Sequence, residues 1–171
     1  SASHFATPLG LIPLDTGSID RISQLSQISI NDEAHSQEHS LEVHLPFLQQ
    51  VLDEFSLIPL VVGQCSPEQV NQVLAELWNG PETLFVISSD LSHYHEYSVA
   101  KKIDQETSEL IEHLDYQHIN YENACGRDPV NGLLHFAKQI GMKADAVDVR
   151  NSGDTAGPRD QVVGYGAYLF H

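Results

Sequence analysis

Basic residues are scarce in this 171-residue sequence. Eight Lys and Arg stand against 24 Asp and Glu, which gives a formal net charge of −16. Proteins that bind nucleic acids need a cationic face to displace counterions from phosphates, and docking on anionic membranes needs basic clusters as well. The composition therefore argues against a nucleic-acid partner and against membrane docking.

Cysteines and long apolar runs are also scarce. Cys65 and Cys125 are too few for a disulfide framework and are typical of a reducing compartment. No apolar run approaches the roughly 20 residues that a membrane span needs. The first residues have neither the basic start nor the apolar core of a signal peptide. We therefore expect a cytoplasmic protein.

The pattern of apolar residues predicts an α/β protein with one domain over residues 1–171. Helical periodicity alternates with short apolar runs, which favours a layered fold with a mostly parallel or mixed central sheet and helices on both faces. A short edge strand or hairpin is expected over 7–15. The predicted helices are 19–27, 36–53, 67–79, 96–114, 118–125 and 129–141, and the predicted strands are 56–63, 83–88, 143–150 and 161–170. Pro46 lies inside 36–53, so the helix there either begins at Pro46, with this residue in its first turn, or is kinked.

The strongest functional candidate is the segment 88–95, Ser-Ser-Asp-Leu-Ser-His-Tyr-His, which follows the predicted strand 83–88. In α/β proteins, ligands gather beyond the carboxyl ends of strands. Asp90 is spaced to orient His93, and an oriented imidazole is what a general base requires. The alternative is that Asp90 caps a turn and the histidines lie at the surface.

A second candidate is the segment 33–44, which holds three histidines and three glutamates. The letters from His35 to His39 spell H-x-x-E-H, the inverted zinc-peptidase motif, in which both imidazoles bind zinc and Glu38 activates water. That chemistry needs a regular helix, and residues 30–36 read more like a loop that leads into one. The alternative is a solvated, acidic helix start.

Two further segments carry polar groups between predicted elements. Asp154 and Thr155 lie in a glycine-containing connection before the last strand, and a plain turn is the alternative there. Cys125 precedes the predicted helix 129–141 and would be reactive at a helix N-terminus, although a buried structural cysteine is the more common case. Arg127 is expected to pair with an acid.

Six segments, taken in their order along the chain, resemble the Memo family. Prokaryotic members of this family are often called AmmeMemoRadiSam system protein B. Each segment is modest alone, and together they span nearly the whole chain. They are Phe5–Gly10, Glu38–Phe47, Ile58–Gly63, Val86–His93, Cys125–Arg127 and Val163–Ala167. The family is similar in structure to the class III extradiol dioxygenases, which are non-haem iron enzymes that open catechol rings.

The resemblance implies a cleft at the strand ends, lined by Asp90 and His93 and approached by His39 and Glu42. It implies catalytic roles for His93, Asp90 and His39, and a partial metal site on His93 and Asp90 that takes iron, or else copper or zinc. Cys125, Arg127, Asp154, Thr155 and Glu42 would contact the substrate, a small molecule or a peptide.

The family's remaining metal ligands lie before the segment that matches Phe5–Gly10, so we expect the N-terminal part of the domain to be missing. Animal members also have a metal-binding cysteine where our alignment places Thr155, and a hydroxyl is a poorer ligand for soft metals.

The leading hypothesis is therefore a Memo-like protein with metal-dependent redox or ring-cleavage chemistry. A non-catalytic module that binds a peptide or partner through the same cleft is the alternative, and a zinc peptidase is a remote one.

Overall fold

The computed structural model describes residues 2–171. The chain divides into two compact units. Among the described residues, unit 1 comprises 2–63 and 76–83, and unit 2 comprises 64–75 and 84–171.

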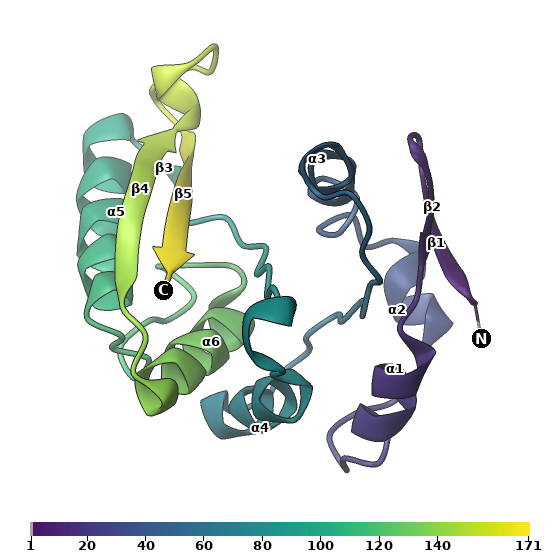
Figure 1. Ribbon diagram of the computed structural model, residues 1–171. Coiled ribbons are helices and arrows are strands. Elements are labelled where there is room, and N and C mark those ends of the chain that lie inside the picture. Colours follow the sequence, from purple (N-terminus) through teal and green to yellow (C-terminus); the bar gives the residue numbers. More distant parts are fainter. Residues whose placement is uncertain (1) are drawn as a thin grey trace. The chain divides into compact units, whose positions relative to one another are not determined.

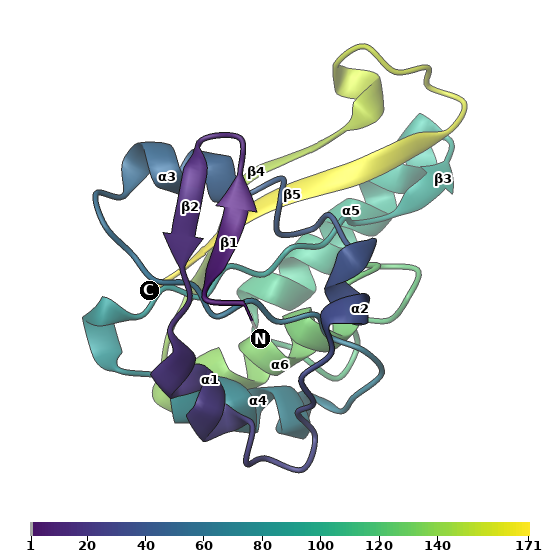
Figure 2. The ribbon, with the colours of Figure 1, turned by 90° about the vertical axis from the view of Figure 1, so that its right-hand side faces the viewer.

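Unit 1 begins with a hairpin of two antiparallel strands, in which Phe5 lies opposite Ile12 (Figure 2). Gly10 has a φ of 132°, a backbone angle that favours glycine and that lets the chain turn back there. The elements of unit 1 are β1 (His4–Thr7), β2 (Gly10–Pro13), α1 (Thr16–Ile22), α2 (Asp32–Ser36), α3 (Leu45–Val51) and the 3₁₀ turn η1 (Gly80–Glu82).

Short side chains start the helices of unit 1. The Asp15 carboxylate accepts the Ser18 N–H at the start of α1, and the Asn31 side chain accepts two N–H groups at the start of α2. Pro46 lies in the first turn of α3, where a missing N–H costs nothing. Within the predicted helix 36–53, the alternative in which the helix begins with Pro46 in its first turn is confirmed, because residues 37–39 are irregular and residues 40–44 form turns.

Unit 2 contains the longer elements. They are β3 (His93–His95), α5 (Tyr97–Glu112), α6 (Arg127–Ile140), β4 (Ala144–Asn151), the 3₁₀ turn η2 (Ser152–Asp154) and β5 (Val162–Phe170). The helix α4 (Pro67–Leu77) begins in unit 2, and its last two residues belong to unit 1. The Ser66 hydroxyl accepts the Gln69 N–H and the Gln69 side chain accepts the Ser66 N–H, which caps the start of α4.

The sheet of unit 2 has the strand order β3-β5-β4, and both pairings are antiparallel. The helix α5 packs against β4 and β5 (Figure 1). The helices α4 and α6 approach so closely that a Cβ on Gly132 would overlap the Val70 side chain. The core of this unit comprises Ile111, Leu114, Ile119, Ala124, Leu134, Ala137 and Ala144.

The mixed α/β class is confirmed, but the parallel central sheet is not found among residues 2–171. Within them, the only parallel contact is an isolated bridge between Leu14 and Leu57. The runs 56–63 and 83–88 belong to neither sheet, and the side chains of Leu84 and Val86 are exposed. The two runs have the composition of buried strands, but a strand also needs a neighbour for its backbone groups. The predicted helix 118–125 is a series of turns.

Candidate functional site

Asp90 and His93 face each other across the turn that leads into β3. The Asp90 Oδ2 atom lies 3.4 Å from the His93 Nε2 atom. Both side chains are partly exposed, so the pair is accessible to solvent and to a ligand. The predicted pairing of this carboxylate with this imidazole is present in the structure.

Cys125 joins this pair from a distant part of the chain, just before α6. Its Sγ atom accepts a hydrogen bond from the Asp90 N–H at 3.3 Å, and the Cys125 N–H donates to the Asp90 carbonyl at 3.3 Å. Next to it, the Gly126 N–H donates to the Ser89 hydroxyl at 2.9 Å. A Cβ on Gly126 would lie 2.8 Å from the Ser89 Cβ, so glycine is what permits this close approach.

Asp90, His93 and Cys125 together place a carboxylate oxygen, an imidazole nitrogen and a thiol sulfur within 4.8 Å of one another. Two ligand atoms that each lie about 2.1 Å from a tetrahedral ion are about 3.4 Å apart. The Asp90–His93 distance matches that spacing. Oxygen, nitrogen and sulfur donors are all ligands that zinc, iron and copper accept in proteins, so the three residues fit a transition metal.

A buried carboxylate, Asp104, supports the segment between Asp90 and His93. It lies on α5, its side chain is 2% exposed, and its Oδ1 atom accepts the Ser92 N–H at 2.9 Å. Burial raises the pKa of Asp104, and the bond from Ser92 opposes that rise in part. Sequence reasoning missed this residue, although a charged residue on the apolar face of a predicted helix was a signal that could have revealed it.

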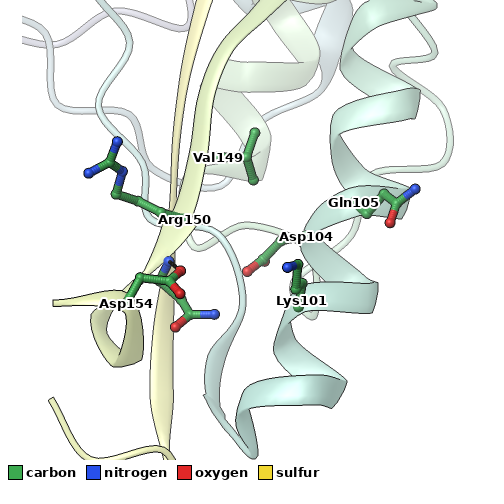
Figure 3. Close-up of a pocket in the computed structure, with 7 residues that line it drawn as sticks. Lys101, Asp104, Gln105, Val149, Arg150 and Asp154 are labelled. Carbon is green, nitrogen blue, oxygen red and sulfur yellow. Dashed lines mark hydrogen bonds between the residues drawn. The ribbon is translucent and has the colours of Figure 1, made fainter.

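A cavity of about 210 Å³ lies beside Asp104, between α5, β4 and η2 (Figure 3). Asp154 lines this cavity and is not part of the Asp90–His93–Cys125 cluster. The Tyr97 hydroxyl donates to the Asp154 carboxylate at 2.6 Å and thereby lowers the pKa of Asp154. The Thr155 hydroxyl donates to the Ser152 carbonyl at 3.0 Å. These bonds make Asp154 and Thr155 part of a structured turn.

Arg127 lies two residues after Cys125 and is held by its own neighbours. Its guanidinium group stacks over the Tyr121 ring at 3.5 Å, and its Nε atom lies 3.1 Å from the Asp128 carboxylate. The expected pairing of Arg127 with an acid is therefore found. The nearby residue Tyr94, which follows His93, has a φ of 58°, which is uncommon for a residue other than glycine.

His39 and Glu42 lie in unit 1, in the turns between α2 and α3. The side chain of His39 is 86% exposed. The Glu38 carboxylate accepts the N–H groups of His39 and Ser40, both at 2.8 Å, and these bonds lower the pKa of Glu38. Because α2 ends at Ser36, the H-x-x-E-H residues do not share one helix, and the geometry of the zinc-peptidase motif is absent.

None of the helices in residues 2–171 is long and apolar enough to span a membrane. Both cysteines in the sequence, Cys65 and Cys125, are free thiols. Burial, and to a smaller extent the charge of Asp128, raises the pKa of the Cys65 thiol.

Comparison with known proteins gives the class to which this fold and these residues belong. A family model described as "Memo-like protein" matches residues 1–169. MEMO1 family proteins of Saccharolobus islandicus and Saccharolobus solfataricus are 36% and 35% identical to the chain over 98% of its length. A MEMO1 family protein of Methanosarcina barkeri is 33% identical over 99%.

The chain belongs to the Memo family. It spans 64% of the length of the two Saccharolobus relatives and 68% of the Methanosarcina one. The resemblance of the six segments is thus confirmed at the level of the family.

Proposed function

We propose that this chain supplies a metal-binding site, built on Asp90, His93 and Cys125, to a Memo-family protein with metal-dependent redox activity. The observation that carries the proposal is the convergence of three different donor atoms within 4.8 Å from two separate chain segments. Carboxylate and imidazole donors suit iron, and the thiolate extends the choice to copper and zinc. Iron is the proposed ion.

A bound iron ion would supply redox chemistry toward a small-molecule substrate, with aromatic ring cleavage by dioxygen as the proposed reaction class. This class, and the layering of an extradiol dioxygenase, rest on analogy to the structural relatives of the family. His39 and Glu42 remain proposed contributors to the site, and further ligands are proposed to come from parts of the full-length protein that this chain does not contain. A cytoplasmic location is also part of the proposal, supported by the two free cysteines.

The residues of the cluster have separate roles in this proposal. In the metal-free protein, the Asp90 Oδ2 atom lies 3.4 Å from the His93 Nε2 atom and orients the ring, and these same two atoms would become ligands when a metal ion binds. The Asp90 N–H donates to the Cys125 sulfur and holds it beside the other two donors. Substrate contacts from Arg127, Asp154 and Thr155 remain proposals.

The proposal is tested by titrating the purified protein with Co²⁺ under anaerobic conditions and recording its absorption. The wild type should show d–d bands together with a thiolate-to-cobalt charge-transfer band. The Cys125→Ser variant should lose the charge-transfer band, and His93→Ala should bind Co²⁺ at least ~100-fold more weakly.

The matched control is His118→Ala. His118 and Asp115 have the same three-residue spacing as His93 and Asp90 and lie 2.8 Å apart, but among residues 2–171 no cysteine joins them in a group of three donors. The control should bind Co²⁺ like the wild type. Equal affinity in His93→Ala and His118→Ala would overturn the metal proposal and favour the alternative, a non-catalytic module that binds a peptide or partner.

A further inference from the structure

We propose that Asp104, which is not a member of the donor cluster, is the positioning residue that sets the geometry of Asp90 and His93. The inference rests on the proposed metal site, because it names the residue that holds two of the ligands in place. It adds a role for α5, an element that contributes no ligand.

The first observation is a hydrogen bond between two buried groups. Asp104 is 2% exposed and Ser92 is fully buried, and the Ser92 N–H donates to the Asp104 Oδ1 atom at 2.9 Å. Ser92 lies between the two ligands, directly before His93 and two residues after Asp90. A change at this bond therefore moves the backbone that carries both ligands.

The second observation is that β5 binds the same segment, next to the Ser92–Asp104 bond. The Gly164 N–H donates to the Ser92 carbonyl at 2.8 Å, and the Leu91 N–H donates to the Gly164 carbonyl at 2.9 Å. A Cβ on Gly164 would overlap the Asp104 carboxylate. Only glycine leaves room for the carboxylate here, so three chain segments meet at Asp104.

The third observation concerns the anchoring of Asp104 itself. The Ser108 hydroxyl, one turn further along α5, donates to the Asp104 carbonyl at 2.7 Å and lies 2.7 Å from the Tyr168 hydroxyl on β5. Figure 3 shows Asp104 on α5 beside the cavity, on the same helix as Lys101 and Gln105. These bonds hold the backbone of α5 at Asp104 against the sheet.

A contact that served packing alone would not need a hydrogen-bond acceptor at this position. Burying an ionisable group is costly, and an apolar side chain of similar size would avoid that cost but leave the buried Ser92 N–H without an acceptor. A carboxylate, in turn, is a stronger acceptor for a backbone N–H than a neutral oxygen. A carboxylate at position 104 is therefore suited to hold the backbone segment that carries Asp90 and His93.

The experiment compares Asp104→Asn and Asp104→Ala in the whole chain. The Asn variant keeps an acceptor oxygen for the Ser92 N–H, and the Ala variant removes it. Two quantities are measured, the NMR chemical shift of the Ser92 amide proton in the metal-free protein and the affinity for Co²⁺. The Ala variant should shift the Ser92 amide proton upfield and weaken Co²⁺ binding by about 10- to 100-fold, and the Asn variant should restore affinity to within about threefold of the wild type.

Gly132→Ala is the control for a general loss of packing. Its added Cβ would overlap the Val70 side chain, a clash as severe as the one at Gly164, but at the contact between α4 and α6. It should lower stability and leave both the Ser92 shift and the Co²⁺ affinity unchanged. Gly164→Ala, which pushes on the carboxylate, should change both.

The positioning role would be overturned if Asp104→Ala left the Ser92 amide shift unchanged, or if Gly132→Ala weakened Co²⁺ binding as much as Asp104→Ala. Failure of the wild type to bind Co²⁺ would overturn the proposed function instead. The Ser92 shift, which needs no metal, would then show by itself whether Asp104 holds this segment.

Discussion

Two segments of this chain combine acidic and imidazole groups within a few residues, and the two differ in their hydrogen-bond partners. In the segment 38–44, the Glu38 carboxylate binds the N–H groups of its own neighbours, and the His39 side chain is 86% exposed. In the segment 88–93, the backbone binds Cys125, Asp104 and Gly164, which lie far away in the sequence. The same residue types therefore give a local cap in the segment 38–44 and a cluster held by distant residues in the segment 88–93, because only the second segment has long-range hydrogen-bond partners among the described residues.

The largest expected effect is a difference in the free energy of unfolding between two Leu→Ala variants, one in each segment. Leu91 is 4% exposed and Leu41 is half-buried. Leu91→Ala should lower the free energy of unfolding by about 2–4 kcal/mol, because the cavity it leaves is enclosed. Leu41→Ala should cost about 1 kcal/mol or less. Urea unfolding followed by far-UV circular dichroism measures both, and an equal cost would remove the distinction between the segments.

The next effect concerns the exchange of backbone amide protons. The Ser92 N–H donates to a buried carboxylate, and the Ser40 N–H donates to the partly exposed Glu38 carboxylate. After correction for intrinsic rates, we expect the Ser92 amide to exchange at least about 10³-fold more slowly, since opening there must break the contacts to β5 as well. Hydrogen exchange measured by NMR provides the comparison. Similar protection at both serines would show that the segment 88–93 opens locally.

Asp104 and Glu38 should make the stability of the protein depend on pH in opposite directions. Burial raises the pKa of Asp104 above its ordinary value of 3.8. The folded state then binds the Asp104 proton more tightly than the unfolded state, so this residue lowers stability as pH rises from about 3.8 through the raised folded value. Asp104→Asn should therefore gain stability relative to the wild type over that rise in pH, as urea titrations at several pH values would show.

Glu38 should have a smaller effect in the opposite direction. The N–H groups of Ser40 and His39 lower the pKa of Glu38 below its ordinary value of 4.5. The stability it contributes is present above that value and is lost as pH falls through the lowered folded value. The advantage of the wild type over Glu38→Gln should shrink in acid, and an advantage that grew in acid would contradict the assigned cause.

Local patterns in the sequence predicted the three longest helices and the two long strands near the C-terminus. The helices expected over 67–79, 96–114 and 129–141 are present with ends shifted by at most two residues, because caps and prolines near their ends are local signals. The strands expected over 143–150 and 161–170 are β4 and β5. The strands predicted over 56–63 and 83–88 were wrong. An apolar run in a sequence indicates burial, and it carries no information about which strand would pair with it.

The candidate site was predicted in part. The spacing of Asp90 and His93 is local and revealed their pairing. For Cys125 the sequence left open a reactive thiol and a buried structural cysteine, and it did not reveal the connection to Asp90 and His93. Asp104 and Gly164 were missed because their roles exist only when α5 and β5 meet the turn before β3. A contact between three segments leaves little trace in any one of them.

The missing side chain at position 164 has a practical consequence for protein engineers. The short motif from Ser88 to His93 cannot be transplanted alone into a new scaffold as a ready-made ligand loop. A graft would also have to bring a carboxylate at the place of Asp104 and a bare backbone at the place of Gly164. Saturation mutagenesis of this neighbourhood should accordingly treat these positions as one coupled unit and vary them together.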